Sequence, residues 1–341
     1  SLYLHETEET WIGVRCISRA KSAALVCVAS ISLFTGGCIG GKGATPVTAY
    51  ELKNYNQDLY QGKLYAEELC VAQNDVALEG YTEDTELHSA ALFDLTGERV
   101  LYSYKAHERL YPASTTKIMT ALLAIENANL DDQVTISGNA DASSFPADAQ
   151  VCGLAKGEVW TLRDLLGALL LYSGNDAATA IAEYVGGSEE AFVNMMNRRA
   201  QELMANGTHF MNPHGLHDDN HYTTAYDLYL IFNECIKHED FVNIIQSEAY
   251  TAYYTDVDGN SQEALFTPTN LYAQGEVDVP ENVTIVGGKT GTTDEAGYCL
   301  ILMEKDSSDN PYISIVMGAS EKPVLYEDMT SLIEAIPSGQ Q

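Results

Sequence analysis

A chain of 341 residues is long enough to bury a sizeable core, and a composition of 45% hydrophobic and 20% charged residues is typical of a globular protein. Its 49 acidic residues against 18 basic ones give a formal net charge of −31, which disfavours nucleic acid and anionic membrane surfaces as partners. A solvated acidic surface is enough to account for the charge itself.

Residues 1–38 have the character of an export signal. Basic residues from Arg15 to Lys21 precede an apolar run, Ala23 to Phe34, and small residues then lead to Cys38. This order is typical of a secretory signal, and the run is too short to span a bilayer comfortably. The segment is similar to a bacterial lipoprotein signal, in which the cysteine is lipidated and starts the mature chain; an uncleaved anchor is the alternative. In either case we expect the rest of the chain to lie outside the cytoplasm, tethered to the membrane at its N-terminal end.

Composition also divides the rest of the chain. Residues 39–80 open with a glycine-rich run and continue as a polar stretch dotted with tyrosines, so we expect a linker and an irregular lead-in. Regular hydrophobic patterns fill residues 81–337, which we predict to be the folded domain, and 338–341 are a short tail.

Four cysteines lie beyond the leader, without the C-x-x-C spacing of a zinc or redox site. Export permits a disulfide, but the sequence selects no pair, and free buried thiols remain the alternative. The four are Cys70, Cys152, Cys235 and Cys299.

A β-hairpin is predicted first, from two apolar runs, 90–94 and 99–104, that flank a turn. It leads into a helix that carries a serine and a lysine three residues apart, Ser114 and Lys117. Apolar residues at i, i+3, i+4 and i+7 from Ile118 indicate that one face of this helix is buried.

Side chains three apart on a helix are neighbours, so the Lys117 amine could take the proton of the Ser114 hydroxyl if burial and nearby positive charge keep the amine neutral. The start of a helix also presents free N–H groups that suit an oxyanion. Taken without other motifs, the pair has an alternative interpretation, in which the serine caps the helix and the lysine is exposed to solvent.

The middle of the chain reads as helices joined by polar loops. Residues 131–157 are loop-like, and a capping box at Thr161 opens a helix that halts before Ser173-Gly174-Asn175. Further helices are predicted over 177–185 and from 188 to near 207. Ser173 and Asn175 should therefore occupy a tight corner between two helices, where polar side chains can project into a cleft.

Four histidines and several acids lie close together over residues 208–221, which invites a metal-site interpretation. The segment is broken by Gly, Pro and Asp, and it lacks an H-E-x-x-H helix, so we predict instead that the histidines hydrogen-bond a long loop in place. The histidines are His209, His214, His217 and His221.

The last third is rich in strands. Runs at 283–291, 297–303 and 312–318 read as strands, and a helix over 325–336 closes the chain. With the early hairpin they make roughly five antiparallel strands, so we predict an α+β fold in which helices flank the sheet and the middle is a largely helical subdomain.

Three short motifs occur in the order Ser114-x-x-Lys117, Ser173-Gly174-Asn175 and Lys289-Thr290-Gly291. Each is common alone, but together, at a helix start, an interhelical corner and a strand, they form the motif set of penicillin-binding proteins and class A β-lactamases. From about 89 to 336 the chain resembles the D-alanyl-D-alanine carboxypeptidases, the low-molecular-mass penicillin-binding proteins of peptidase family S11. The resemblance also rests on Tyr-Pro-Ala-Ser-Thr-Thr-Lys, Asn-Pro-His-Gly-Leu and Gly-Gly-Lys-Thr-Gly-Thr-Thr.

This resemblance implies a β-lactamase/transpeptidase-like fold and acyl transfer on peptidoglycan stem peptides that end in D-Ala-D-Ala, with β-lactams as inhibitors and without a metal or cofactor. Ser114 would attack the carbonyl between the two D-alanines, with Lys117 as general base. Ser173 would help to carry a proton to the departing amine, and Asn175 would orient the Lys117 amine and the substrate amide.

The strand motif would receive the terminal carboxylate of the substrate. Lys289, whose charge would also help to keep Lys117 neutral, would bind it together with Thr290 and Thr292. The backbone N–H groups of Thr292 and Ser114 would form the oxyanion hole.

The chain departs from the family pattern at three points. Members often carry an arginine near the start of the final helix that helps to hold the carboxylate; residues 319–326 contain none, and Lys322 is the candidate substitute. Many members carry a C-terminal β domain and a helix that tethers them to the membrane. In this chain an N-terminal anchor would take over the tethering. Third, the Ser-Gly-Asn motif and the lack of a Glu-x-x-Leu-Asn segment disfavour a β-lactamase.

The leading hypothesis is thus an exported serine D,D-carboxypeptidase. D,D-transpeptidation or β-lactam hydrolysis on the same fold is the enzymatic alternative. A non-catalytic wall-binding lipoprotein is the alternative from another class, and a metal-dependent carboxypeptidase built on the histidine loop is a distant fourth.

Overall fold

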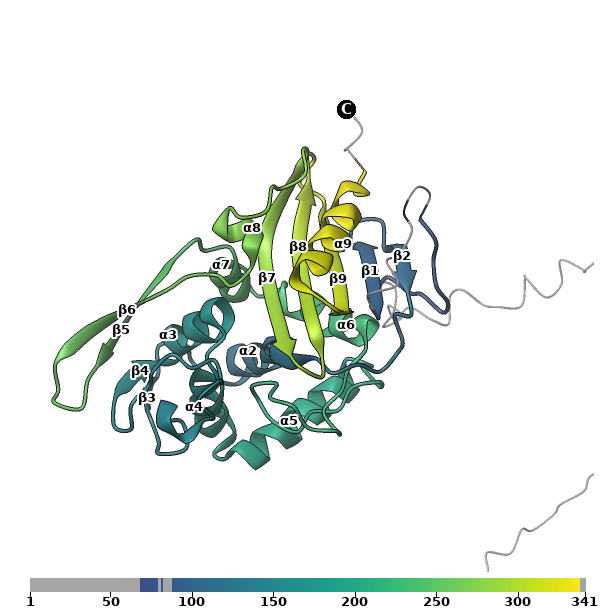
Figure 1. Cartoon of the computed structure of the whole chain (residues 1–341). Helices are drawn as coiled ribbons and strands as arrows, with labels where there is room; N and C mark the ends of the chain where they lie inside the picture. The colour runs from purple at the N-terminus through teal and green to yellow at the C-terminus, as the bar shows by residue number, and fades with distance from the viewer. Residues whose placement is uncertain (1–67, 79–80, 82–87, 338–341) are drawn as a thin grey trace, which may run out of the picture. The chain divides into compact units, whose positions relative to one another are not determined.

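A five-stranded antiparallel sheet is the frame of the structure, a computed structural model that describes residues 68–78, 81 and 88–337 (Figure 1). The strands lie in the order β2 (Arg99–Tyr104), β1 (Ser89–Asp94), β9 (Pro311–Ala319), β8 (Gly297–Asp306) and β7 (Val283–Thr293). The predicted hairpin is therefore confirmed as β1 and β2, and the predicted late strands as the other three. The predicted leader and the tail lie outside the described residues.

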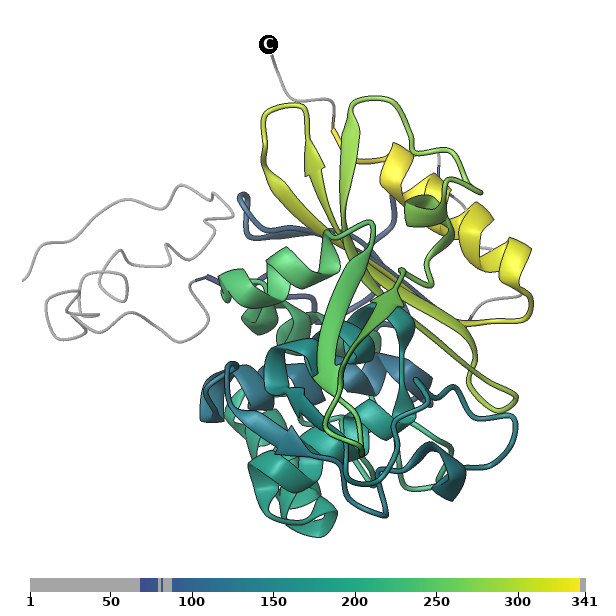
Figure 2. The ribbon, with the colours of Figure 1, turned by 90° about the vertical axis from the view of Figure 1, so that its left-hand side faces the viewer.

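Helices cover both faces of this sheet, which confirms the α+β prediction. Helix α9 (Lys322–Glu334) packs on β8 and β9 and buries Leu325 and Met329 in a core with Leu300. On the other face α6 (Ala225–Cys235) lies against β1 and β9. There the ring of Tyr229 stacks on Phe93, with centroids 4.0 Å apart. Figure 2 shows the sheet above the helical part of the molecule.

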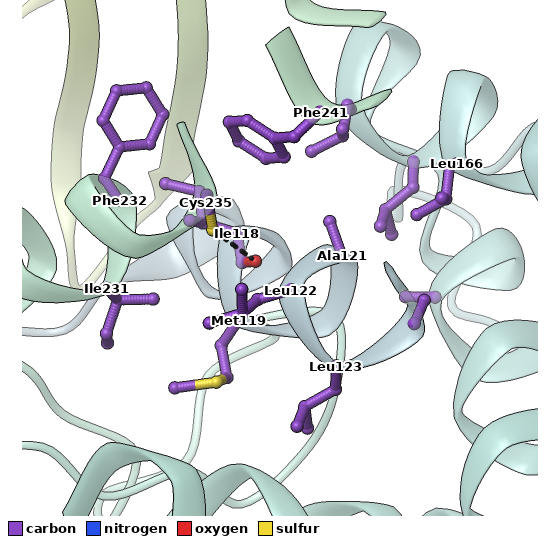
Figure 3. Packing of buried hydrophobic residues seen from close by; sticks show 14 of the residues in the cluster. Ile118, Met119, Ala121, Leu122, Leu123, Leu166, Ile231, Phe232, Cys235 and Phe241 are labelled. Atoms are coloured by element: carbon purple, nitrogen blue, oxygen red, sulfur yellow. Dashed lines mark hydrogen bonds between the residues drawn. The ribbon is translucent and has the colours of Figure 1, made fainter. Parts of the chain in front are cut away.

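The helix that follows Ser114 is α2 (Lys117–Asn127), and it lies at the centre of the helical part. The sequence predicts one buried face, but every residue from Lys117 to Ala124 is buried. The difference arises because other helices surround α2, as Figure 3 shows for part of this core. Its neighbours include α4 (Asn175–Gly186), α5 (Glu189–Glu202), α6 and α7 (Glu239–Ile245).

A second, four-stranded sheet was not predicted. Its strands lie in the order β3 (Gln133–Thr135), β4 (Val159–Thr161), β5 (Tyr250–Thr255) and β6 (Ser261–Phe266). The prediction of a loop over 131–157 is wrong at β3, because strands of three residues are too short to show a period of two. The pairing depends on contacts distant in sequence, such as Trp160 stacked on Tyr254 with centroids 4.2 Å apart.

The chain from β4 to α4 places the second motif. Thr161 caps α3 (Leu162–Gly167) by accepting the N–H of Asp164, which confirms the predicted helix start. The five residues Ala168–Tyr172 then form a π-helical turn, η4, and α4 begins at Asn175. Two short helical segments complete the fold, η3 (Ala142–Ser144) and α8 (Leu271–Gln274).

The cysteines of the described region are all free thiols, and three of them, Cys70, Cys235 and Cys299, are buried. Cys235 donates a weak hydrogen bond to the Ile118 carbonyl, at 3.5 Å, within the core drawn in Figure 3. The expected core position of Cys299 in β8 is confirmed. Among the helices that the structure describes, none is long and apolar enough to cross a membrane.

Glu304 is a fully buried carboxyl group in β8. One oxygen accepts a hydrogen bond from Ser314 Oγ at 2.6 Å, and the other has no hydrogen-bond partner among the described residues. Burial raises the pKa of Glu304 well above its usual value. The folded protein therefore holds a proton here that the unfolded chain releases as the pH rises.

We predict that the free energy of unfolding of Glu304→Gln falls less than that of the wild type as the pH rises. A carboxyl whose pKa is raised on folding contributes its full stability below the unfolded pKa, and stability falls above it by up to about 1.4 kcal/mol per pH unit until the folded pKa is reached. Urea unfolding at pH 5 and pH 8 should show a smaller decline in the free energy of unfolding for Glu304→Gln than for the wild type. Equal declines would contradict a proton held at Glu304.

Candidate active site

Ser114 lies in a tight turn at the entrance to α2. The turn is the 3-10 segment η2 (Ala113–Thr116), so the predicted helix begins three residues later, at Lys117. Ala113 adopts a left-handed φ of 48°, which is uncommon for a residue with a side chain and costs about 1–2 kcal/mol. The predicted proximity of the two side chains is nonetheless confirmed, with Lys117 Nζ 2.9 Å from Ser114 Oγ.

Lys117 is completely buried, and its amine has three oxygen neighbours. Besides Ser114 Oγ, Nζ lies 2.7 Å from Asn175 Oδ1 and 2.6 Å from the carbonyl oxygen of His214. Loss of hydration lowers the pKa of Lys117 well below its usual value, and the charge of Lys289 lowers it further. These effects favour the neutral amine.

The neighbours of Nζ also fix where its lone pair points. A neutral amine has two hydrogens and one lone pair, and both the amide oxygen of Asn175 and the carbonyl oxygen of His214 can only accept. If these two oxygens take the two hydrogens, the lone pair is left for the hydroxyl of Ser114. The arrangement is therefore suited to removing the proton of Ser114.

The His214 carbonyl is held in place by a glycine. Gly215 has a φ of +89°, in the left-handed region, and a Cβ there would lie 1.9 Å from the carbonyl oxygen of Ala113. Asn212 accepts the N–H of Gly215 at 2.7 Å. This turn brings the backbone of residues 212–215 against the Ser114 turn, so that a main-chain oxygen reaches Lys117.

Ser173 projects from the corner between η4 and α4, as predicted. It ends the π-helical turn in the left-handed conformation, with φ 71° and ψ 34°, and Asn175 then starts α4. Ser173 Oγ accepts a hydrogen bond from Lys289 Nζ at 2.9 Å. The corner thus joins the first motif through Asn175 and the third motif through Ser173.

Strand β7 crosses the Ser114 turn closely enough to require a glycine. A Cβ on Gly291 would lie 2.9 Å from the Pro112 carbonyl oxygen and 3.0 Å from the backbone nitrogen of Ser114. Lys289 is on the same buried face of β7, while Thr290 and Thr292 are more exposed. Thr290 Oγ1 is 2.6 Å from Thr269 Oγ1, a partner that the sequence did not suggest.

A pocket of about 270 Å3 opens over these groups. Although the chain is strongly acidic, the described residues that line this pocket include no Asp or Glu, and one of them, Lys322 at the start of α9, is an exposed cation. A pocket of hydroxyl groups and a lysine suits an anionic ligand group. The lining comprises Ser114, Gln150, Ser173, Thr269, Thr290, Gly291, Thr292, Tyr298, Cys299, Lys322, Leu325 and Tyr326.

Lys289, which is predicted to bind the substrate carboxylate, is buried next to the pocket. It is 1% exposed, is absent from the residues that line the pocket, and bonds Ser173 Oγ and the Thr290 carbonyl, both at 2.9 Å. The alternation of β7 places its side chain on the same face as Gly291, and its contact with Ser173 links it to the pocket lining. Burial lowers the pKa of Lys289 to about 7.

The histidine loop is held by hydrogen bonds, as predicted. His221 Nε2 lies 2.8 Å from Thr116 Oγ1, and its Nδ1 accepts the N–H of Met211. His214 Nδ1 accepts the N–H of Leu216. Burial lowers the pKa of His214 to about 3 and that of His221 to about 4, so both rings are neutral at pH 7.

Within the described ranges, the acidic and histidine side chains spaced like metal ligands lie elsewhere, at Glu126, Glu234 and His238. Arg199 already pairs with both carboxylates of that group, at 2.6 Å and 3.3 Å. An arginine neutralises the charge that would attract a cation, so this group is adequately explained as an ion-pair cluster.

Sequence reasoning missed three parts of the site, namely the His214 carbonyl, Thr269 and Gln150. The Pro-His-Gly run gave a signal for the first, because glycine after a proline-broken turn often marks a left-handed residue. Thr269 and Gln150 lie in irregular segments, and no motif in the sequence distinguishes them.

Comparison with known proteins agrees with this geometry. The model of the D-alanyl-D-alanine carboxypeptidase family, peptidase S11, matches residues 77–321. D-alanyl-D-alanine carboxypeptidase DacF of Bacillus subtilis is 34% identical over 254 residues, which cover 73% of this chain and 61% of the relative. A D-alanyl-D-alanine carboxypeptidase of Streptomyces sp. is 32% identical, over 68% of this chain and 81% of the relative. The chain thus spans about three fifths of the length of the first of these relatives.

Solved structures show the same fold. The Streptomyces K15 DD-transpeptidase superimposes with a TM-score of 0.68 at 28% identity, over 75% of this chain and 98% of that protein. Penicillin binding protein 5 of Haemophilus influenzae gives a TM-score of 0.65 at 27% identity, over 75% and 72% of the two chains. By family model, relatives and fold, the chain belongs to the D-alanyl-D-alanine carboxypeptidase family, peptidase S11.

Proposed function

We propose that this protein is a serine D,D-carboxypeptidase that removes the terminal D-alanine from peptidoglycan stem peptides. The observation that carries the proposal is the buried amine of Lys117, 2.9 Å from Ser114 Oγ, beneath a pocket whose described lining lacks acids. The names of the relatives support a substrate whose C-terminal end is D-Ala-D-Ala. The free carboxylate of such an end matches the hydroxyl groups and the lysine of the pocket.

In the proposed acylation, Lys117 takes the proton of Ser114 as Oγ attacks the carbonyl carbon between the two D-alanines. The backbone N–H groups of Ser114 and Thr292 stabilise the oxyanion. The C–N bond then breaks, and Ser173 passes a proton to the departing amine. Its contact with Lys289 supports this role, since Lys289 can replace the proton that Ser173 gives up.

Deacylation uses water. Before this step, the proton that Lys117 took from Ser114 replaces the one that Lys289 gave to Ser173, so both lysines regain their starting states. Neutral Lys117 then accepts a proton from the water molecule that attacks the acyl-serine and returns it to Ser114 Oγ as the ester bond breaks, which frees the shortened peptide. Asn175 keeps the Lys117 amine oriented through both steps, and its position 2.7 Å from Nζ supports this role.

The carboxylate site is proposed to combine Thr290, Thr292 and Lys322 at the pocket with Lys289 below it. Gly291 allows β7 to pass over the Ser114 turn, so that this strand edge and the nucleophile border the same pocket. Lys322 compensates for the arginine that relatives often carry near this position.

D,D-transpeptidation is the second candidate function. The observation that favours it is the likeness to the Streptomyces K15 structure, which is named a DD-transpeptidase and of which the match covers 98%. The two reactions share the acyl-serine and differ in whether water or an amine resolves it. Incubation of the enzyme and substrate with glycine as an added acceptor would separate them, because transpeptidation yields a new amide product.

We further propose that residues 81–337 form the catalytic domain and act outside the cytoplasm. The basic flank, apolar run and Cys38 of residues 1–38 support export and N-terminal tethering, through a lipidated Cys38 or an uncleaved anchor. Labelling of cells with palmitate, with Cys38→Ala as the comparison, would distinguish the two.

We predict that Ser114→Ala abolishes both D-alanine release from a D-Ala-D-Ala peptide and covalent labelling by a fluorescent penicillin, each by more than about 1,000-fold. The reason is that Ser114 Oγ is the hydroxyl that the Lys117 amine contacts, at 2.9 Å. Circular dichroism should show an unchanged fold, and Ser331→Ala, on an exposed part of α9, serves as the matched control. Retention of D-alanine release by Ser114→Ala would refute the proposal.

Gly215→Ala should slow acylation by penicillin by about 100-fold, because displacement of the His214 carbonyl lets the Lys117 amine turn away from Ser114. Gly275→Ala is the matched control: Gly275 also has a positive φ, +72°, but a Cβ there meets nothing within 4 Å. Stopped-flow labelling would measure both rates. If the two variants slow acylation equally, general backbone strain and not the His214 carbonyl is the cause.

Lys322→Gln should raise KM about tenfold for a peptide with a free terminal carboxylate and leave kcat nearly unchanged, since an exposed cation contributes mainly to binding. A peptide amidated at its C-terminus should not distinguish Lys322→Gln from the wild type. Lys305→Gln, remote from this pocket, is the control. An unchanged KM for the free carboxylate would exclude Lys322 from the site.

A further inference from the structure

Asp176 follows the second motif and is a completely buried carboxylate. It accepts four backbone N–H groups. Oδ1 accepts those of Cys152 and Ala177, both at 2.9 Å, and Oδ2 accepts those of Gly153 at 2.9 Å and Leu154 at 3.1 Å. Three of these donors belong to one short stretch, residues 152–154, which the carboxylate therefore fastens to the start of α4.

The fastened stretch leads directly into the site. Two residues before Cys152, the carbonyl of Gln150 accepts the N–H of Asn175 at 2.8 Å. The side-chain amide of Gln150 donates to the carbonyl of Tyr172 at 3.3 Å, and Gln150 lines the pocket beside Ser173. Asn175 is thus held from two sides, by its own helix and by a loop that depends on Asp176.

Asp176 also acts electrostatically on Lys117. It raises the pKa of the Lys117 amine and so opposes burial and Lys289, but its effect is smaller than theirs and than that of Cys152. The titratable groups with an electrostatic influence on Lys117, or on which Lys117 acts, are Lys289 on β7, Cys152 and Asp176, and His214 and His221 of the histidine loop.

We propose that Asp176 is a positioning residue: by tying residues 152–154 to α4 it fixes Asn175, which contacts the Lys117 amine, and Gln150, which lines the pocket. It touches neither Ser114 nor the pocket, so its effect on acylation is exerted through Asn175 and Lys117. The inference rests on the proposed function of Lys117 as the base for Ser114.

Asp176→Asn tests this role with little change in shape. The amide has one oxygen, and its NH2 group would face two of the N–H donors that the carboxylate now accepts, so residues 152–154 should detach. Asp141→Asn is the matched control. Asp141 accepts the N–H groups of Ser143 and Lys156 in the same loop, both at 2.9 Å, and has no influence on Lys117 in the structure.

The readouts are the rate of acylation by a fluorescent penicillin and its dependence on pH, measured on the whole protein. Acylation should be slower by about tenfold in Asp176→Asn and unchanged in Asp141→Asn. The rate requires neutral Lys117 and so rises with pH through the pKa of this lysine. Removal of the Asp176 charge lowers that pKa, and the acidic limb should move to lower pH, which a purely structural role would not cause.

The proposal would be overturned if Asp176→Asn showed the wild-type rate of acylation and the wild-type acidic limb of the pH–rate profile. It would also be overturned if Asp141→Asn slowed acylation as much as Asp176→Asn does. If Asp176→Asn does not fold, amide hydrogen exchange on the wild type decides. Gly153 is exposed, yet the hydrogen bond from its N–H to Asp176 predicts slow exchange of this hydrogen. Exchange as fast as in a free loop would show that Asp176 does not hold residues 152–154, and would refute the proposal. Failure of the proposed function is distinguishable, because the wild type itself would then not be acylated.

Discussion

The proposed mechanism depends on one buried lysine whose pKa is lowered by its surroundings. Lys117 is fully enclosed at the start of the central helix α2, and the charge of Lys289 acts against its protonation. An ammonium group in such a place would be costly unless it were paired, and no carboxylate bonds its amine among the described residues. Three oxygens surround Nζ instead, and two of them can only accept. Burial and these oxygen contacts are what suit Lys117 to the proposed role of base for Ser114.

The parts that enforce this state come from distant segments of the chain. The five-stranded sheet supplies β7, whose Gly291 lets the strand lie on the Ser114 turn and whose Lys289 reaches Ser173. The loop of residues 212–215 supplies a carbonyl, and α4 supplies Asn175. Two of the non-glycine residues in the left-handed conformation, Ala113 and Ser173, lie at these points. Packing of the helices around α2 maintains these strained conformations, which would relax in a looser structure.

The sequence predicted the side chains of the site well and their backbone supports poorly. Ser114, Lys117, Ser173, Asn175 and Lys289 carry recognisable chemistry at recognisable spacings, and the structure brings them together. The His214 carbonyl could be supplied by any residue, so the only signal for it is the glycine that follows. The four-stranded sheet escaped prediction because its short strands pair residues far apart in the chain. Lys289 was expected to bind the substrate carboxylate, but the sequence did not indicate that its amine would be buried against Ser173 and the Thr290 carbonyl.

The charge on Lys117 is the central claim, and neutron diffraction from a deuterated crystal at pH 7 would test it most directly. The account predicts two deuterons on Nζ, directed at Asn175 Oδ1 and the His214 carbonyl, and a deuteron on Ser114 Oγ directed at Nζ. Three deuterons on Nζ, one of them directed at Ser114 Oγ, would contradict it, because the lysine would then be a charged donor that could not accept the proton of Ser114.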